Sequence, residues 1–209
     1  MSKIASKAAE RSVIMFTLSY LLVASLLAWR TENWEFVLYI VIVLIAGLLL
    51  MQIHRKVQFS TGVLWLLSIW GLMHMLGGFV PVSAEWPLGS DKAVLYNLWL
   101  IPYVFKYDNL VHAYGFGVCT WTCWQILQPI VTGEKEYVSE IILAVFASNG
   151  LGALNEIIEF FAVLWLPNTN VGGYENTGWD LVFNIIGSCI AAFIIWFGKP
   201  IEIDLSKTT

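Results

Sequence analysis

Long apolar runs alternate with short polar connections along most of the chain. A run of about 18 or more apolar residues is long enough to cross the hydrocarbon core of a bilayer as a helix. The pattern predicts an all-α, polytopic membrane fold with about six transmembrane helices. Their approximate ranges are 12–29, 36–53, 60–80, 108–131, 138–166 and 179–197. Because the connections are too short for a soluble domain, we expect one membrane domain over residues 1–209.

Lysine and arginine set the expected orientation, because they are enriched on the cytoplasmic side of membrane proteins. With the N-terminus inside, the inner ends carry eight of these residues and the outer ends carry three: Arg30, Lys92 and Lys106. Both termini are therefore expected to be cytoplasmic. Tryptophans fall near the ends of the expected spans, as in an interfacial aromatic belt.

Composition supports a membrane protein and excludes one class of partner. The chain is 58% hydrophobic and only 12% charged, which is about half the charged fraction of an ordinary soluble domain. The sequence has neither a basic stripe nor a nucleic-acid-binding motif, so we exclude nucleic acid and take the lipid bilayer as the first partner. Cys119 and Cys123 share a helix face, and we interpret them as small packing residues rather than metal ligands.

Eight polar side chains interrupt the last four spans, although an ionised group at the bilayer centre costs about 2.5–3.5 kcal/mol on insertion scales. They are His74, Asp108, His112, Asn155, Glu156, Glu159, Asp180 and Asn184. With the orientation above, all eight fall in the outer part of their spans. The lysine and arginine pattern is independent of these residues, so their agreement on one layer predicts a single polar cluster near the outer face.

Helical spacing brings these polar side chains onto shared faces. Asp108 and His112 are four residues apart, and Asp180 and Asn184 repeat that spacing. Glu156 and Glu159 share a face of the fifth span. Glycines beside these residues let the helices approach closely.

Histidine and carboxylate side chains converging from several helices suit a divalent metal such as Zn²⁺, Mn²⁺ or Fe. We expect the metal ligands to be His74, Asp108, His112, Glu159 and Asp180. Glu156 then acts as a general base toward a metal-activated water. The E-x2-H pairs of di-iron bundles do not occur here.

Structural interpretations of the same residues stay open. Asp108 and Asp180 each lie at an expected helix start, where aspartate is a favoured cap. His74 can be a core histidine bonded across helices, and Asn184 fits interhelical hydrogen bonding better than a ligand role. Glu156 and Glu159 are the hardest to explain as structure, because the spans offer them no Lys or Arg partner.

The motifs "YDNLVHAYGFG", "NEIIEFF" and "WDLVFNIIGS" resemble those of the YjdF-type inner-membrane proteins, an uncharacterised family. They are also distantly similar to the VanZ-like pattern, in which an acidic residue precedes a histidine and D-x3-N-x2-G follows later. The resemblance covers about residues 72–187, and Ala113 and Phe160 depart from it. It implies a multi-pass protein of a prokaryotic inner or plasma membrane, and it implies no particular reaction.

A cluster at head-group depth favours an amphiphilic substrate. We expect a metal-dependent enzyme that acts on a lipid or isoprenoid-linked substrate at the outer leaflet, with hydrolysis as the favoured reaction. The alternative is a non-enzymatic accessory or assembly subunit of a membrane complex, in which the cluster only fixes helix packing. An ion conductor fits less well, because the ionisable groups do not continue into the inner half of the spans.

The outer segment 82–107 combines turn-forming Pro and Gly with the apolar stretch "YNLWLIPYVF", which is too short to span. We expect it to lie at the interface as a short helix or re-entrant stretch that covers the cluster.

Overall fold

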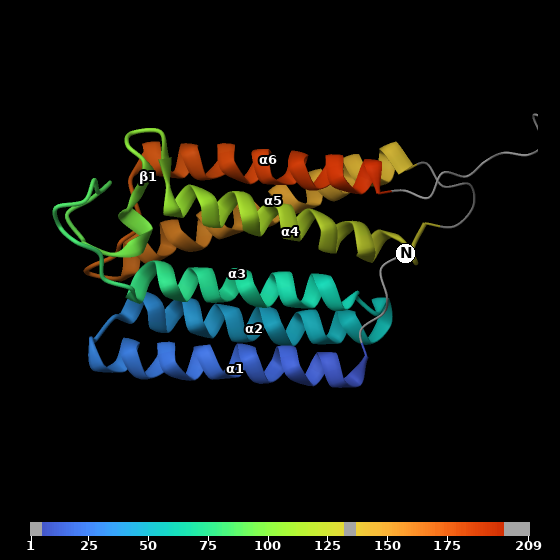
Figure 1. Ribbon diagram of the computed structural model, residues 1–209, viewed down its shortest axis with the longest axis horizontal. Helices are drawn as coiled ribbons and strands as arrows, with labels where there is room; N and C mark the ends of the chain where they lie inside the picture. The colour runs from blue at the N-terminus through green and yellow to red at the C-terminus, as the bar shows by residue number, and fades with distance from the viewer. Residues whose placement is uncertain (1–5, 132–136, 199–209) are drawn as a thin grey trace, which may run out of the picture.

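The computed structural model describes residues 6–131 and 137–198. In this part of the chain, six long helices run side by side along one direction (Figure 1). They are α1 (Lys7–Arg30), α2 (Trp34–Val57), α3 (Thr61–Phe79), α4 (Tyr107–Leu127), α5 (Tyr137–Trp165) and α6 (Tyr174–Phe197). The expected all-α, polytopic class is confirmed.

Five of these helices are long and apolar enough to cross a membrane, and α4 is not among them. The reason is its position. Helix α4 packs against α3, α5 and α6, and 11 of its 21 residues are buried. A helix surrounded by protein can carry polar side chains without exposing them to lipid. The expected span at α4 is therefore compatible with a membrane because the neighbouring helices cover α4, even though its own sequence is less apolar.

Several helix ends differ from the expected span ends for local reasons. Helix α1 begins at Lys7 because the side chain of Ser6 accepts a hydrogen bond from the Ala9 N–H and caps it. Helix α4 ends at Leu127, since Pro129 cannot continue the helical hydrogen bonds. Helix α6 begins at Tyr174 rather than at residue 179, which adds one and a half turns at the end that carries the polar cluster.

The helices form two groups of three, α1 to α3 and α4 to α6, joined by contacts between α3 and α4 (Figure 1). A core cluster in the first group forms around Leu21, Phe36 and Met75. Large apolar side chains point outward along α1, α2, α5 and α6, as expected for helices that face lipid.

Glycine lets α4 and α6 approach most closely. A Cβ added to Gly187 would lie 1.8 Å from the backbone oxygen of Ala113, well inside contact distance. A Cβ added to Gly115 would lie 2.1 Å from the indole of Trp70 on α3. These two positions set the separation of the helices that carry the polar residues.

The segment between α3 and α4 forms a hairpin instead of the expected short helix or re-entrant stretch. It contains a single 3₁₀ turn, η1 (Leu95–Asn97), followed by an antiparallel hairpin of β1 (Trp99–Ile101) and β2 (Phe105–Lys106). A helix is excluded here by Pro102, which lacks an N–H, and by Tyr103, whose φ is +58°. Proline followed by a positive φ is the pattern of a type II turn, and Val104 N–H donates to the Ile101 carbonyl across it at 3.0 Å.

Hydrogen bonds tie the loops at this end of the bundle to α2. The carboxylate of Glu35 accepts from the Asn170 N–H at 2.7 Å. The side chain of Asn97 donates to Asn170 Oδ1 at 3.0 Å and to the Lys92 carbonyl at 2.8 Å. The loop before α6 and the segment before α4 therefore form one connected cap on the bundle.

Substituting Gly187 by alanine tests the close helix approach. The added methyl group would collide with the Ala113 carbonyl and separate α4 from α6, so Gly187→Ala should lower the free energy of unfolding by about 1–3 kcal/mol. Gly150→Ala is the matched control, because its Cβ would meet nothing within 4 Å. Thermal unfolding in detergent measures both; equal melting temperatures would contradict the packing described here.

Candidate functional site

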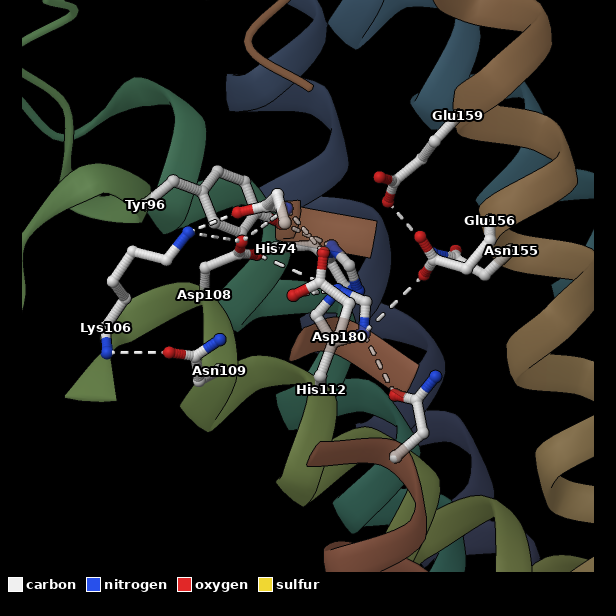
Figure 2. A network of polar contacts seen from close by, with 12 residues as sticks. His74, Tyr96, Lys106, Asp108, Asn109, His112, Asn155, Glu156, Glu159 and Asp180 are labelled. Atoms are coloured by element: carbon white, nitrogen blue, oxygen red, sulfur yellow. Dashed lines mark hydrogen bonds and ion pairs between the residues drawn. The ribbon is translucent and has the colours of Figure 1, made fainter. Parts of the chain in front are cut away.

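Five of the six residues that the sequence singled out as site residues converge at the hairpin end of the bundle (Figure 2). Asp108 and His112 come from the first two turns of α4, and Asp180 comes from α6. Glu156 and Glu159 reach in from α5. The site thus collects side chains from three neighbouring helices.

Three potential ligand atoms face one another: His112 Nε2, Asp108 Oδ1 and Asp180 Oδ1. We call them the three inward atoms. His112 Nε2 lies 3.7 Å from Asp108 Oδ1 and 3.8 Å from Asp180 Oδ1. Two atoms bound to one ion at 2.0–2.2 Å in tetrahedral geometry lie about 3.4 Å apart. The observed spacing therefore needs only a small contraction to hold a divalent cation.

The second polar atom of each of these residues is held by another side chain. Asp180 Oδ2 accepts from Asn176 Nδ2 at 2.5 Å. Asp108 Oδ2 lies 3.6 Å from Lys106 Nζ and accepts from Asn176 Nδ2 at 3.4 Å. On the far side of the ring, His112 Nδ1 donates to Asn184 Oδ1 at 2.9 Å. The three inward atoms are oriented by groups behind them.

Asn184 determines the chemistry of the imidazole. Its side-chain oxygen can only accept a hydrogen bond, so the proton of neutral His112 resides on Nδ1 and the lone pair on Nε2. That lone pair points toward the two aspartates. The interhelical bond expected of Asn184 is present, and it also sets the tautomer that a metal ligand needs.

Glu156 is buried with little hydrogen bonding. Its side chain is 8% exposed, and neither carboxylate oxygen has a well-formed hydrogen bond among the described residues, although Asn155 and Thr177 are near enough to interact with it. His112 Nδ1 lies 4.0 Å from Glu156 Oε1. Asp180 Oδ1 is likewise buried and without a hydrogen bond. Unpartnered buried carboxylate oxygens are rare and call for an explanation such as a bound ion or water.

Glu159 and His74 stand somewhat apart from the three inward atoms. Glu159 Oε1 accepts from Asn155 on its own helix at 2.9 Å, and Glu159 shares the Nδ1 side of His112 with Glu156. His74 Nδ1 is hydrogen-bonded to the hydroxyl of Tyr96 instead of meeting the aspartates. The sixth expected residue therefore belongs to a neighbouring contact between α3 and η1.

Tyr96 lies in η1, outside the six long helices, and is partly buried. Burial, and then the nearby carboxylates of Asp108 and Glu159, raise the pKa of Tyr96 well above its usual value. The phenol therefore stays protonated at neutral pH. Its contact with His74 is a neutral hydrogen bond, the core role that the sequence left open for this histidine.

Neither aspartate caps a helix through a hydrogen bond. Helix α4 is capped by Asn109, whose side-chain oxygen accepts from the Lys106 N–H at 2.9 Å, although Asp108 lies in the first turn, where the helix dipole favours a carboxylate. Helix α6 starts at Tyr174, which places Asp180 well inside the helix, so the capping interpretation of Asp180 is wrong.

The cysteines take no part in the cluster. Cys119 and Cys123 are buried on α4, and Cys189 is exposed on α6. The metal-compatible groups found among the described residues contain only histidine and carboxylates.

Three further residues of the site were not expected from the sequence: Tyr96, Lys106 and Asn176. Asn176 had a readable signal, since Asn176, Asp180 and Asn184 follow one another at intervals of four. It was missed because the span was expected to begin at residue 179. Lys106 immediately precedes the motif "YDNLVHAYGFG", and the sequence does not show which way its side chain points.

Comparison with known proteins gives a family but no reaction. Residues 11–199 match the model of a family described as "Predicted membrane protein (DUF2238)". A stretch of 97 residues is 31% identical to an uncharacterised protein of Thermotoga maritima, and covers 46% of this chain and 50% of that protein. The match thus spans about half the length of the relative. No solved structure matches the chain. The YjdF-type resemblance is consistent with this family, and the VanZ-like one remains a likeness of short motifs.

Replacing Glu156 by leucine tests whether the cluster serves packing. A buried carboxylate without partners destabilises the fold, so Glu156→Leu should raise the free energy of unfolding of chelator-treated protein by about 1–3 kcal/mol. Glu35→Leu is the control, because Glu35 is equally buried but accepts the Asn170 N–H. Glu35→Leu should lower the free energy of unfolding by a similar amount. If thermal unfolding shows that both variants are less stable than the wild type, a structural role for Glu156 is favoured.

Proposed function

The chain belongs to the DUF2238 family of membrane proteins, and we propose that it is a metal-dependent membrane enzyme acting on the polar head of a lipid or isoprenoid-linked substrate. Hydrolysis is the favoured reaction. The observation that carries this proposal is the geometry around His112 Nε2, where two aspartate oxygens lie within 3.8 Å while the other atom of each ligand residue is held from behind.

The proposed ligand set is smaller than the sequence suggested. Asp108, His112 and Asp180 supply one inward atom each. His74 is engaged with Tyr96, and Glu159 is bonded to Asn155, so neither is needed as a ligand. Three protein ligands leave coordination positions for water and substrate, which is the usual arrangement of a catalytic rather than a structural site.

Charge favours a cation at this place. Four carboxylates gather around one histidine, and Lys106 forms an ion pair with one of them, Asp108. Carboxylates at such distances repel one another and take up protons unless a positive charge compensates them. A divalent ion bound by the two aspartates and His112 would supply that charge. Zn²⁺, Mn²⁺ and Fe²⁺ all accept this mixture of nitrogen and oxygen ligands.

Glu156 is suited to the part of general base. Neither oxygen has a well-formed hydrogen bond among the described residues, and Oε1 lies 4.0 Å from His112 Nδ1. The proposed ion lies at the other ring nitrogen, so Glu156 can act only on a metal-bound water that projects toward α5. A divalent ion lowers the pKa of a bound water toward about 7. In hydrolysis the water oxygen joins the electrophilic centre of the substrate, Glu156 takes a proton from that water, and the oxygen that leaves receives a proton in return.

The depth of the site selects the substrate class. The cluster lies near the hairpin end of the bundle, because His112 and Asp180 are each in the second turn of a helix that begins there. Lipid head groups lie at this depth, whereas acyl chains lie deeper, in the hydrocarbon core. The excess of Lys and Arg at the opposite end, including Arg55 and Lys56 at the end of α2, favours the outer leaflet.

Metal content tests the proposal. Purified protein incubated with Zn²⁺, Mn²⁺ or Fe²⁺ and then dialysed should retain close to one ion per chain by mass spectrometry of the elements. Asp180→Asn keeps the size of the side chain and should weaken retention tenfold or more. His74→Gln should leave it unchanged, because His74 is bonded to Tyr96. A folded protein that retains no ion under any of these conditions would contradict the proposal and favour the accessory-subunit alternative.

Asn184 offers a second, independent test. Asn184→Leu removes the acceptor that fixes the tautomer of His112 and should weaken metal binding about 10–100-fold. Asn184→Asp keeps an acceptor at the same place and should bind the ion at least as well as the wild type. Metal affinity measured by competition with a chelator distinguishes the two. Equal affinities of both variants would mean that Asn184 serves packing alone.

A further inference from the structure

Lys106 lies where the β1–β2 hairpin meets the polar cluster. We propose that Lys106 and the hairpin tip, residues 101–104, form a binding site for the phosphate-bearing head group of a membrane lipid. We call this the head-group site. The inference names the substrate class of the metal centre and rests on the proposed function for the reaction. Binding of the lipid can be measured without any reaction.

The ammonium group of Lys106 is held next to the ligand aspartate. Its Nζ lies 3.6 Å from Asp108 Oδ2 and donates a hydrogen bond to Asn176 Oδ1. The other oxygen of Asp108 faces His112 Nε2 at 3.7 Å. Lys106 and the proposed ion therefore lie on opposite sides of one carboxylate, as Figure 2 shows for Lys106, Asp108 and His112.

This pairing suits a phosphate. A phosphate group carries several anionic oxygens, so one can bind the ion while another meets the lysine. A metal ion together with Lys or Arg is the usual arrangement for holding a phosphoryl group. A neutral ester head group would use the ion but would have no need of a second cation. The lysine thus favours a phosphate-bearing lipid among the amphiphiles that the site admits.

The hairpin tip presents apolar side chains outward. Tyr103 is 87% exposed, Val104 66% and Ile101 55%. Figure 1 shows the hairpin standing to the side of the bundle end, next to the start of α6, rather than extending along the bundle axis. The rings of Phe105 and Phe183 pack at 5.4 Å and fix the hairpin to α6. The tip is therefore continuous with the lipid-facing surface of that helix.

Tyr103 supports contact with a membrane. Its φ of +58° is one that glycine adopts without strain and tyrosine does not. Its ring fills no core position, since the described residue in ring contact with it is Trp99, at 6.0 Å on the same hairpin. Tyrosine and tryptophan are enriched at the level of the lipid head groups. An interfacial role explains an aromatic residue where the backbone alone would favour glycine.

The hairpin keeps the lysine close to its apolar tip. Lys106 follows Tyr103 by three residues, and a strand rises about 3.3 Å per residue, so the two lie within about 10 Å of each other. A lipid whose phosphate meets Lys106 can therefore place its chains against the apolar tip. Free phosphate would not require the apolar tip, and for this reason we assign the site to a lipid.

Competition for a labelled lipid tests the wild-type protein directly. The full chain in detergent micelles is loaded with dansyl-labelled phosphatidic acid, whose binding is followed by energy transfer from tryptophan. Dioleoyl phosphatidic acid should displace the label at least tenfold more effectively than dioleoylglycerol, which has the same chains and no phosphate. Millimolar inorganic phosphate should not displace it. Equal displacement by dioleoylglycerol, or full displacement by inorganic phosphate, would overturn the head-group site.

Variants locate the binding. Lys106→Met should weaken the binding of phosphatidic acid about tenfold and Lys106→Arg by less than threefold, whereas Lys92→Met, at an exposed lysine of the same segment, should have no effect. The double change Ile101→Ser and Val104→Ser leaves the cluster untouched and should also weaken binding. The wild-type comparison decides the question even if Lys106→Met does not fold.

Metal content of the same samples separates the two proposals. If phosphatidic acid is preferred but no ion is retained, the head-group site stands and the proposed metal-dependent reaction fails. If the ion is retained and Lys106→Met binds phosphatidic acid like the wild type, the metal centre stands and the head-group site fails.

Discussion

The structure depends on one electrostatic constraint: ionisable side chains are buried together between helices, where water cannot solvate them. His112, Glu156 and Asp180 are buried, Asp108 is partly buried, and all four lie within a bundle that carries large apolar side chains on its outer surface. Burying a charge without a partner is far more costly than burying a hydrocarbon group. The close approach of α4 and α6 at Gly187, and the loops fixed by Glu35 and Asn170, keep this arrangement in place despite its cost.

The same constraint separates a packing network from a functional site. A network that serves packing satisfies its polar atoms, as Gln125 and Ser60 do between α3 and α4 at the other end of the bundle, with Nε2 and Oγ 2.9 Å apart. The cluster around His112 differs. Among the described residues, one atom each of Asp108, His112 and Asp180 is held by another side chain, while Glu156 and the other oxygen of Asp180 have no well-formed hydrogen bond. Side chains that are oriented by hydrogen bonds on one side and have unpaired polar atoms on the other are typical of a site that binds a ligand or an ion.

The sequence predicted the bundle and the layer in which polar residues gather, because hydrophobic length and helical spacing depend on local order alone. It also predicted that Asp108 and His112 share a face. It could not predict that His74 turns toward Tyr96, since these residues are 22 positions apart and their contact depends on the path of the chain between α3 and η1. Nor could it reveal Lys106 and Asn176, whose roles follow from a hairpin and from an earlier start of α6. The lower apolarity of α4 is explained by its neighbours, because α3, α5 and α6 pack around it.

X-ray absorption spectroscopy of the protein loaded with Zn²⁺ or Mn²⁺ tests the proposed metal centre most directly. The bound ion should have a shell of nitrogen and oxygen at about 2.0–2.2 Å that includes a single imidazole. The imidazole signal should disappear in His112→Gln and persist in His74→Gln. A bound ion with no imidazole in its shell, or an unchanged spectrum in His112→Gln, would contradict a metal centre built on His112.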